Sequence, residues 1–186
     1  MKSIRFRVTG TTPLLMNSPK AMRPVEDGAQ ASRRTPTPEA EAENGAYRSA
    51  DGSLHFPALA FRSALVAAGT GFKAGKRGLP SVLQGAVFSV GDTVDLVDPA
   101  SGSKLSTYAV DVRRCCVTSA GRKVGVMRAR PRLDAWACTV EFEYDERFVD
   151  ERTITQTFER AGATVGIGNF SPRWSGPFGR FSVEIA

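Results

Sequence analysis

Residues 136–161 read WACTVEFEYDERFVDERTITQTFERA, and the spacing of their apolar side chains changes from a period of two to a helical one. The alternation over residues 136–144 predicts a strand with one buried face. That face holds Cys138, Val140, Phe142 and Tyr144. Asp150 or Thr153 can cap a following helix, which we expect to end before Gly162. Its apolar face holds Ile154, Phe158 and Ala161. The change of period predicts a domain of mixed α and β structure.

Outward from this stretch the same patterns recur. Residues 2–9, KSIRFRVT, alternate strictly and predict a second half-buried strand. Pro57 to Gly69 predicts a helix, because Pro favours the first helical position and Gly favours the end. Its expected apolar face holds Leu59, Ala60, Ala64, Leu65 and Ala68. Further strands are expected at residues 82–90, 93–97, 107–112 and 178–185. The order strand, helix, strands, helix, strand predicts an α+β domain with a mostly antiparallel sheet.

Residues 17–44 differ in character from the rest of the chain. They contain four prolines, many small residues and almost no large apolar ones. Such a segment cannot bury enough surface to offset the entropy of ordering it. We therefore expect one domain over residues 1–186 with a long flexible loop at about residues 17–46.

Composition limits the class of protein. No apolar stretch approaches the roughly 20 residues that span a bilayer, and the first residues lack the pattern of a secretory signal. Cys115 and Cys116 are adjacent and Cys138 is the third cysteine, which indicates a reducing compartment rather than a disulfide framework. These cysteines and the single His55 lack zinc-ligand spacing. We expect a cytoplasmic protein with no metal, no cofactor and no membrane contact.

Positive charge is gathered in one segment. Lys and Arg total 25 and Asp and Glu total 19, for a net charge of +6, and no acid lies between Asp111 and Asp134. Arg128, Arg130 and Arg132 recur at every second residue, so an extended chain places them on one face about 6.6–7 Å apart. A polyanion would relieve their repulsion. The alternative is an edge strand kept soluble by charge, with Pro131 at the edge. The cations of this segment are Arg113, Arg114, Arg122, Lys123, Arg128, Arg130 and Arg132.

The segment GIGNFSPRWSGPFGRFSV at residues 166–183 combines glycines with aromatic and basic side chains. Glycines let the backbone approach a ligand and leave N–H groups free for phosphates, while aromatic rings offer stacking surfaces for bases. We expect a nucleic-acid cradle formed by Gly166, Gly168, Phe170, Arg173, Trp174 and Arg180. The alternative is a turn with aromatic rings in the core, which we favour for Phe178 and Phe181.

Two segments together resemble the RAMP superfamily of CRISPR-associated proteins. One is FPALAFRSAL at residues 56–65, similar to the superfamily's Pro-led helix after a short strand. The other is the Gly-rich segment, with Gly176, Phe178, Gly179 and Arg180 before the last strand. The resemblance implies a ferredoxin-like or RRM-type antiparallel sheet with two helices, a mobile insertion, and a Gly-rich loop that contacts RNA. Backbone subunits of the superfamily polymerise along a guide RNA, and phage or mobile-element relatives fit the resemblance equally well.

These observations lead to three hypotheses. The favoured one is a non-enzymatic protein of antiviral defence that binds single-stranded RNA or DNA, with RNA preferred, independently of sequence. It would act as a homo-oligomer or as a subunit of a ribonucleoprotein complex. The second is a metal-independent endoribonuclease, for which the resemblance implies His55 as a catalytic candidate and, more weakly, Asp27. The third is a self-assembling phage or mobile-element protein that binds single-stranded DNA.

Overall fold

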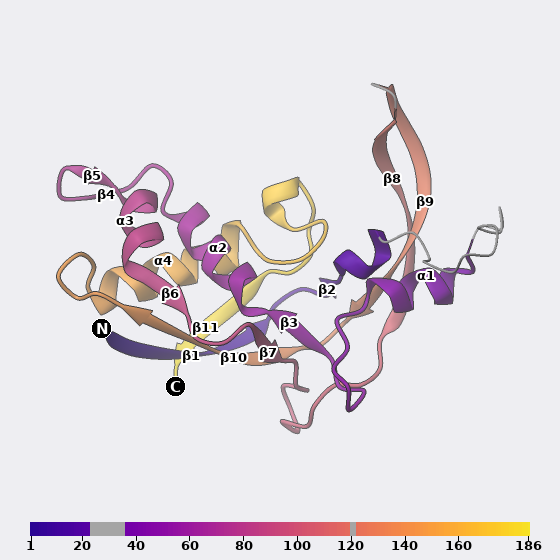
Figure 1. Cartoon of the computed structure of the whole chain (residues 1–186), viewed down its shortest axis with the longest axis horizontal. Helices are drawn as coiled ribbons and strands as arrows, with labels where there is room; N and C mark the ends of the chain where they lie inside the picture. The colour runs from indigo at the N-terminus through magenta and orange to yellow at the C-terminus, as the bar shows by residue number, and fades with distance from the viewer. Residues whose placement is uncertain (23–35, 120–121) are drawn as a thin grey trace.

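The computed structural model describes residues 1–22, 36–119 and 122–186 (Figure 1). Within these ranges the chain is mixed α+β, with four α-helices and antiparallel sheets. The helices are α1 (Pro38–Gly45), α2 (Ala58–Ala68), α3 (Leu79–Ala86) and α4 (Glu151–Thr164), with short 3-10 helices at Pro19–Met22 and Pro172–Trp174. The strands are β1 (Lys2–Gly10), β2 (Leu14–Leu15), β3 (His55–Pro57), β4 (Lys73–Ala74), β5 (Arg77–Gly78), β6 (Val87–Ser89), β7 (Thr93–Asp95), β8 (Ala109–Ser119), β9 (Arg122–Leu133), β10 (Ala137–Tyr144) and β11 (Phe181–Ile185).

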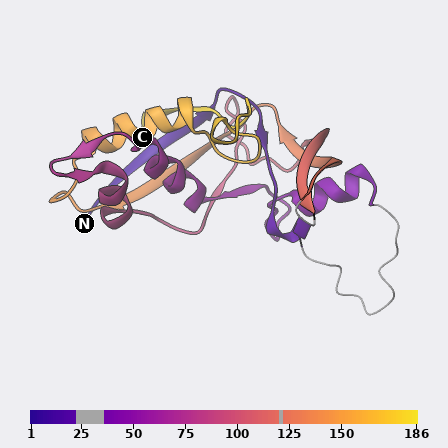
Figure 2. The same cartoon turned by 90° about the horizontal axis from the view of Figure 1, so that it is seen from above.

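The principal sheet has four strands in the order β11-β1-β10-β6, and every neighbouring pair is antiparallel. Figures 1 and 2 show α2, α3 and α4 on one face of this sheet. The alternation predicted for β1 and β10 is confirmed, because Ile4, Phe6 and Val8 are buried beneath the helices. In β10 the predicted apolar face is buried as well.

Aromatic rings join the sheet to the helices. The ring of Phe158 on α4 lies 5.1 Å from that of Phe6, 5.2 Å from that of Phe142 and 5.3 Å from that of Phe181. All four side chains are buried. Edge-on and tilted contacts of this kind add to the stabilisation from buried area. The core of the domain therefore lies between the principal sheet and α2, α3 and α4.

Gly162 allows the closest helix–strand contact in this core. It lies inside α4, not beyond its end as expected, and a methyl group on it would overlap the carbonyl oxygen of Phe181 on β11. We predict that Gly162→Ala lowers the free energy of unfolding by about 1–3 kcal/mol because the site is overpacked. The control is Gly85→Ala in α3, where open space surrounds the glycine. That variant should stabilise by up to about 1 kcal/mol. Urea unfolding of both variants measures the difference, and equal signs would contradict it.

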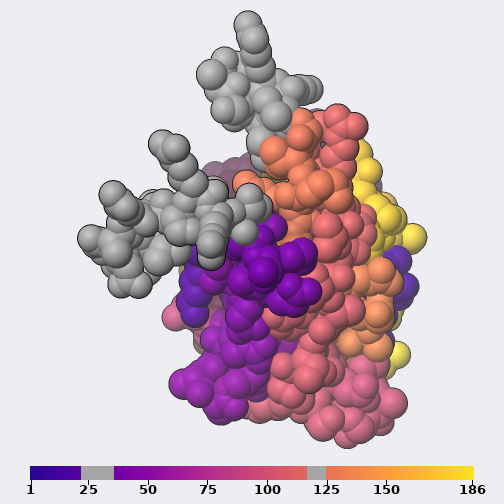
Figure 3. All heavy atoms as spheres, turned by 90° about the vertical axis from the view of Figure 1, so that its right-hand side faces the viewer, coloured from indigo at the N-terminus to yellow at the C-terminus, as the bar shows by residue number. Residues whose placement is uncertain are grey.

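A second sheet, in the order β2-β9-β8, carries a long hairpin away from the core (Figure 1). β8 and β9 pair from Ala109–Arg132 to Ser119–Arg122. Helix α1 packs against β9, and Figure 3 shows it beside the hairpin at that end of the molecule. Along residues 128–133 of β9, Ala129, Pro131 and Leu133 are buried and the three arginines alternate with them, as the sequence predicts.

The expectation of a loop over residues 17–46 and of two helices is wrong where α1 lies. Thr37 caps this helix by accepting a hydrogen bond from the Ala40 N–H at 3.3 Å, and Pro38 occupies its first turn. The carboxylate of Glu41 then binds Arg128 at 3.0 Å and the Ala129 N–H at 3.1 Å. These contacts come from a strand far along the chain, so composition alone could not reveal them.

The expected strand at 82–90 and the expected face of the first long helix also need correction. Val82, Leu83 and Ala86 are buried on one side of α3, which begins at Leu79 with Pro80 in its first turn. Only residues 87–89 form a strand there. In α2 the side chain of Leu59 is 57% exposed, and Phe61 is buried in its place. Both errors come from runs so apolar that periodicity alone does not identify the buried face.

Candidate nucleic-acid interface

One face of the β8–β9 hairpin turns toward the Gly-rich loop. The guanidinium carbon of Arg113 lies 5.5 Å from the ring centre of Phe170 and 4.4 Å from that of Phe178. The guanidinium of Arg130 lies 5.4 Å from the ring centre of Phe170. Cations over ring faces are favourable contacts, especially when partly desolvated. The structure thus joins two of the predicted hairpin arginines to one of the predicted loop aromatics.

Carboxylates from outside the acid-free segment bind three of its arginines. Asp111 binds Arg113 through both oxygens and lies 3.8 Å from Arg132. Arg132 also binds Asp134 at 2.6 Å, and Arg128 binds Glu41 at 3.0 Å. The segment contains no acidic residue in its sequence, but carboxylates from outside it lie beside its arginines in the folded structure. These arginines are therefore less available to phosphates than their number indicates.

The remaining cations of the segment fall into two groups. Among the described residues, Arg114 and Arg130 have no carboxylate within 4.0 Å. Arg114 is exposed on the opposite face of β8, whereas Arg130 is half-buried and donates to the Cys115 sulfur at 2.9 Å. Its Nε atom is buried with no acceptor among the described residues. Arg122 and Lys123 lie in β9, but their side chains fall outside the described part.

Asp111 controls both the stability and the charge of the hairpin. Its carboxylate is buried, and the hydrogen bonds from Arg113 hold the pKa of that carboxyl below its usual range. A lowered pKa stabilises the folded state above the ordinary pKa near 4, and this contribution is lost as the pH falls through the lower folded value. We predict that Asp111→Asn removes this acid dependence and lowers the free energy of unfolding by about 1–3 kcal/mol.

The same variant should bind a polyanion more tightly. Freeing Arg113 for one phosphate contact should make the slope of log affinity against log salt concentration steeper by about 0.7. This corresponds to a gain in affinity of about fivefold at 0.1 M salt. Fluorescence anisotropy with labelled poly(U) at several salt concentrations measures this change. Asp134→Asn is the control, because its exposed carboxylate binds only Arg132. An equal gain in both variants would indicate a general charge effect and contradict the prediction.

The Gly-rich loop is held by its own backbone and by the segment after β1. The Ile167 N–H donates to the Gly179 oxygen at 2.9 Å, and the Gly179 N–H donates to the Pro13 oxygen at 2.8 Å. The Asn169 N–H donates to the Leu15 oxygen at 2.9 Å. Most loop amides are therefore used inside the fold. The N–H groups of Gly168 and Phe170 have no acceptor among the described residues.

Aromatic and basic side chains of this loop differ widely in exposure. Phe178 and Phe181 are buried, which confirms the core role expected for them. Trp174 is 68% exposed, and the guanidinium of Arg173 lies 5.5 Å from its ring centre. Arg180 donates to the Ala163 oxygen at 3.1 Å near the end of α4. Trp174 and Arg173 thus present an open ring and cation, while Arg180 is engaged by the helix terminus.

The face of the principal sheet away from the helices has a different composition. Arg5 binds Glu141 at 2.8 Å, and Arg7 lies directly opposite Glu184 on β11. Glu143 is exposed on the same face. Because cations and carboxylates balance here, this face lacks the basic and aromatic character of a surface for single strands.

Of the two catalytic candidates, the structure describes His55. His55 lies in β3, and its Nδ1 atom is 2.9 Å from the Ser49 hydroxyl. Partial burial lowers the pKa of His55, which favours its neutral form at pH 7. Asp27 lies outside the described residues. Within the described ranges, no three His, Cys, Asp or Glu side chains are grouped to hold a metal ion.

Three features were missed from sequence, two at this interface and one, a group of exposed cations, away from it. Asp111 and Asp134 were treated as limits of the basic segment, although alternation places Asp111 beside Arg113 on one face. Glu41 was assigned to a loop. The exposed cations Lys73, Lys76 and Arg77 were passed over, although no acid occurs between Asp51 and Asp92. This second acid-free run is a signal that could have found them.

No protein-family model matches the chain, and no curated protein is significantly similar to it. None of the helices in the described ranges has the length and apolar character needed to cross a bilayer.

Proposed function

We propose that this chain binds single-stranded nucleic acid, RNA in preference to DNA, independently of sequence. The observation that carries the proposal is the grouping of cations and rings where the hairpin meets the Gly-rich loop. Arg113 and Arg130 lie over Phe170, and Arg173 lies beside the exposed Trp174. Splayed bases of a single strand can stack on such rings, whereas a duplex hides its base faces.

The strand order supports a ferredoxin-like core within this proposal. β1, β6, β10 and β11 follow one another along the chain, with α2 before the second and α4 before the last. Their order in the sheet is β11-β1-β10-β6, which is that of a split βαβ pair. Together with the two motifs, this order favours a RAMP-like subunit of a ribonucleoprotein complex or homo-oligomer in the cytoplasm.

The number of cations without a carboxylate partner determines how strongly salt concentration should change the affinity for nucleic acid. Arg130 and Arg173, on the side of the Gly-rich loop, have no carboxylate partner among the described residues, whereas Arg114 lies on the opposite face of β8. At about 0.7 per phosphate contact, two contacts predict a slope near −1.4 for the logarithm of affinity against that of salt concentration. The expected dependence is therefore moderate for this surface.

Two measurements test the proposal. The first is the 260/280 nm absorbance ratio of the purified protein before and after RNase or DNase, which shows what co-purifies and of which class. The second is anisotropy with labelled poly(U), poly(dT) and a duplex of equal length. We expect poly(U) to bind most tightly and the duplex most weakly. Affinity unchanged between about 0.05 and 0.5 M salt, or no binding to any single strand, would refute the proposal.

The ribonuclease hypothesis has a separate test. His55 has the Ser49 hydroxyl as its hydrogen-bonded side-chain partner, and burial lowers the pKa of His55, which favours its neutral form. Incubating the protein with RNA in EDTA, beside His55→Ala, measures any metal-independent cleavage. Cleavage that disappears in the variant would favour an enzyme.

A further inference from the structure

Unpaired positive charge gathers at the end of the domain opposite the β8–β9 hairpin (Figure 1). There the short hairpin of β4 and β5 carries Lys73, Lys76 and Arg77, and all three side chains are exposed. Among the described residues, none of them has a carboxylate within 4.0 Å. In this respect they differ from Arg113, Arg128 and Arg132, which all have such partners.

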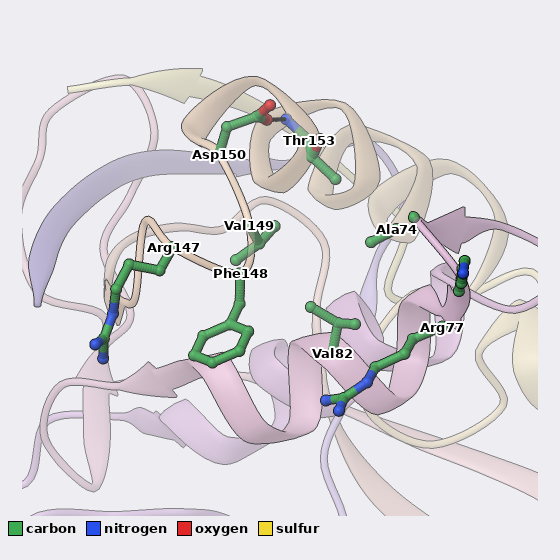
Figure 4. A pocket seen from close by; sticks show the side chains of 10 residues that line it. Ala74, Arg77, Val82, Arg147, Phe148, Val149, Asp150 and Thr153 are labelled. Atoms are coloured by element: carbon green, nitrogen blue, oxygen red, sulfur yellow. Dashed lines mark hydrogen bonds between the residues drawn. The ribbon is translucent and has the colours of Figure 1, made fainter.

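A cavity of about 570 Å³ lies beside these cations, between the β4–β5 turn, α3 and the residues before α4. Figure 4 shows Val82 and Val149 within it and Arg77 along one side. The ring of Phe148 forms part of its wall and is 55% exposed. The guanidinium of Arg147 lies 5.8 Å from the centre of this ring. The cavity therefore combines an apolar floor, a partly exposed aromatic ring and a cationic rim.

Asp150 is the acidic residue among those that line the cavity. Its carboxylate accepts a hydrogen bond from the Thr153 N–H at 2.7 Å and caps α4. Arg147, also a lining residue, binds Asp145 outside the cavity at 2.6 Å, which lowers the pKa of Asp145 to about 2. Lys76 and Arg77 therefore remain to attract an anion, since neither has a carboxylate partner among the described residues.

We infer that this cavity is a second contact for single-stranded nucleic acid, with phosphates at Lys76 and Arg77 and a base against Phe148. The inference rests on the proposed function and extends it to the far end of the domain. A base is flat and apolar on its faces, so it can lie against the ring of Phe148. The phosphate of its nucleotide carries the negative charge that the cationic rim attracts. An acidic peptide would match the rim, but it would leave the exposed ring without a flat partner.

The experiment compares the wild type with Lys76→Ala/Arg77→Ala and with Phe148→Ala. The probe is a labelled poly(U) strand of about 16 nucleotides, the upper end of the site size of a small single-strand-binding domain. Lys76→Ala/Arg77→Ala loses two phosphate contacts, so the slope of log affinity against log salt concentration should become shallower by about 1.4 and binding should weaken about 25-fold at 0.1 M salt. Phe148→Ala loses one stacked base, so its binding should weaken about 5- to 150-fold.

The matched control is Arg5→Ala/Lys104→Ala, which removes the same formal charge from cations paired with Glu141 and Asp95. We expect less than a threefold change from it. Circular dichroism should be the same for all four proteins, since every substituted side chain is exposed.

The outcomes separate this inference from the proposed function. If the wild type binds the strand and Lys76→Ala/Arg77→Ala binds equally well, the second contact is refuted and the proposed function stands. If the wild type binds no strand, the proposed function itself fails. Competition by polyglutamate that is as strong as that by poly(U) and is lost in the variant would assign the cavity to an acidic protein segment. A change in oligomeric state without nucleic acid would assign it to a second copy of the chain. Either of these last two results overturns the inference.

Discussion

Replacing Gly179 by Ala should lower the free energy of unfolding by about 4 kcal/mol and disorder the Gly-rich loop. Gly179 has a φ of 67°, a left-handed conformation that costs side-chain-bearing residues about 1–2 kcal/mol. A methyl group would also overlap the carbonyl oxygen of Ile167, and overpacking of this kind costs about 1–3 kcal/mol more. Thermal or urea unfolding measures the loss.

Gly102→Ala separates the two causes. Gly102 has a φ of 72°, similar to that of Gly179, but open space surrounds it in a surface turn. The control should therefore lose only about 1–2 kcal/mol. Similar losses in the two variants would show that the close approach to Ile167 contributes little. Because the loop positions Phe170 and Trp174, Gly179→Ala should also weaken binding of single strands.

Replacing Trp174 by Ala should weaken binding of single-stranded RNA by about 1–3 kcal/mol, or about 5- to 150-fold. The ring is 68% exposed and its removal leaves the core intact, so the free energy of unfolding should change by less than about 0.5 kcal/mol. Anisotropy with poly(U) at fixed salt measures the loss of binding, and urea unfolding measures the stability.

Two further variants make this result specific. Trp174→Phe keeps an aromatic face and should retain most of the affinity. Ile185→Ala removes an apolar side chain of similar exposure, 57%, at the end of β11 and should bind normally. If Trp174→Phe is as weak as Trp174→Ala, the contribution does not come from stacking. If Ile185→Ala is equally weak, it does not depend on the loop.

The spacing of apolar residues predicted the elements that bury one face and expose the other. β1 and β10 alternate because one face meets the helices and the other is open, and α4 shows its cap at Asp150 and its buried stripe. The cap of α1 at Thr37 was missed from sequence. The contacts of that helix with Arg128 and Ala129 join it to a strand far along the chain, so they could not be seen locally. The surrounding prolines and small residues therefore indicated a loop.

The strand that carries the hairpin arginines was predicted, but the pairing of their charges was not. The sequence correctly placed Arg128, Arg130 and Arg132 on alternate positions of one strand, because an extended chain has a period of two. Arg128 is neutralised by Glu41 and Arg132 by Asp134, whereas Arg130 has no carboxylate partner among the described residues. The contact of Arg128 with Glu41 joins residues far apart in the chain, so it cannot be read from spacing.

The order of strands in the principal sheet also affects how the domain is made. β1 is synthesised early, but both of its partners, β10 and β11, lie more than a hundred residues later in the chain. β1 therefore cannot pair until β10 and β11 have left the ribosome, and its apolar face stays exposed until then. Such long-range pairing slows folding and exposes apolar strands to other chains in the meantime. We expect the principal sheet to form only after β11 has been synthesised, and recovery of the domain on refolding to fall as protein concentration rises.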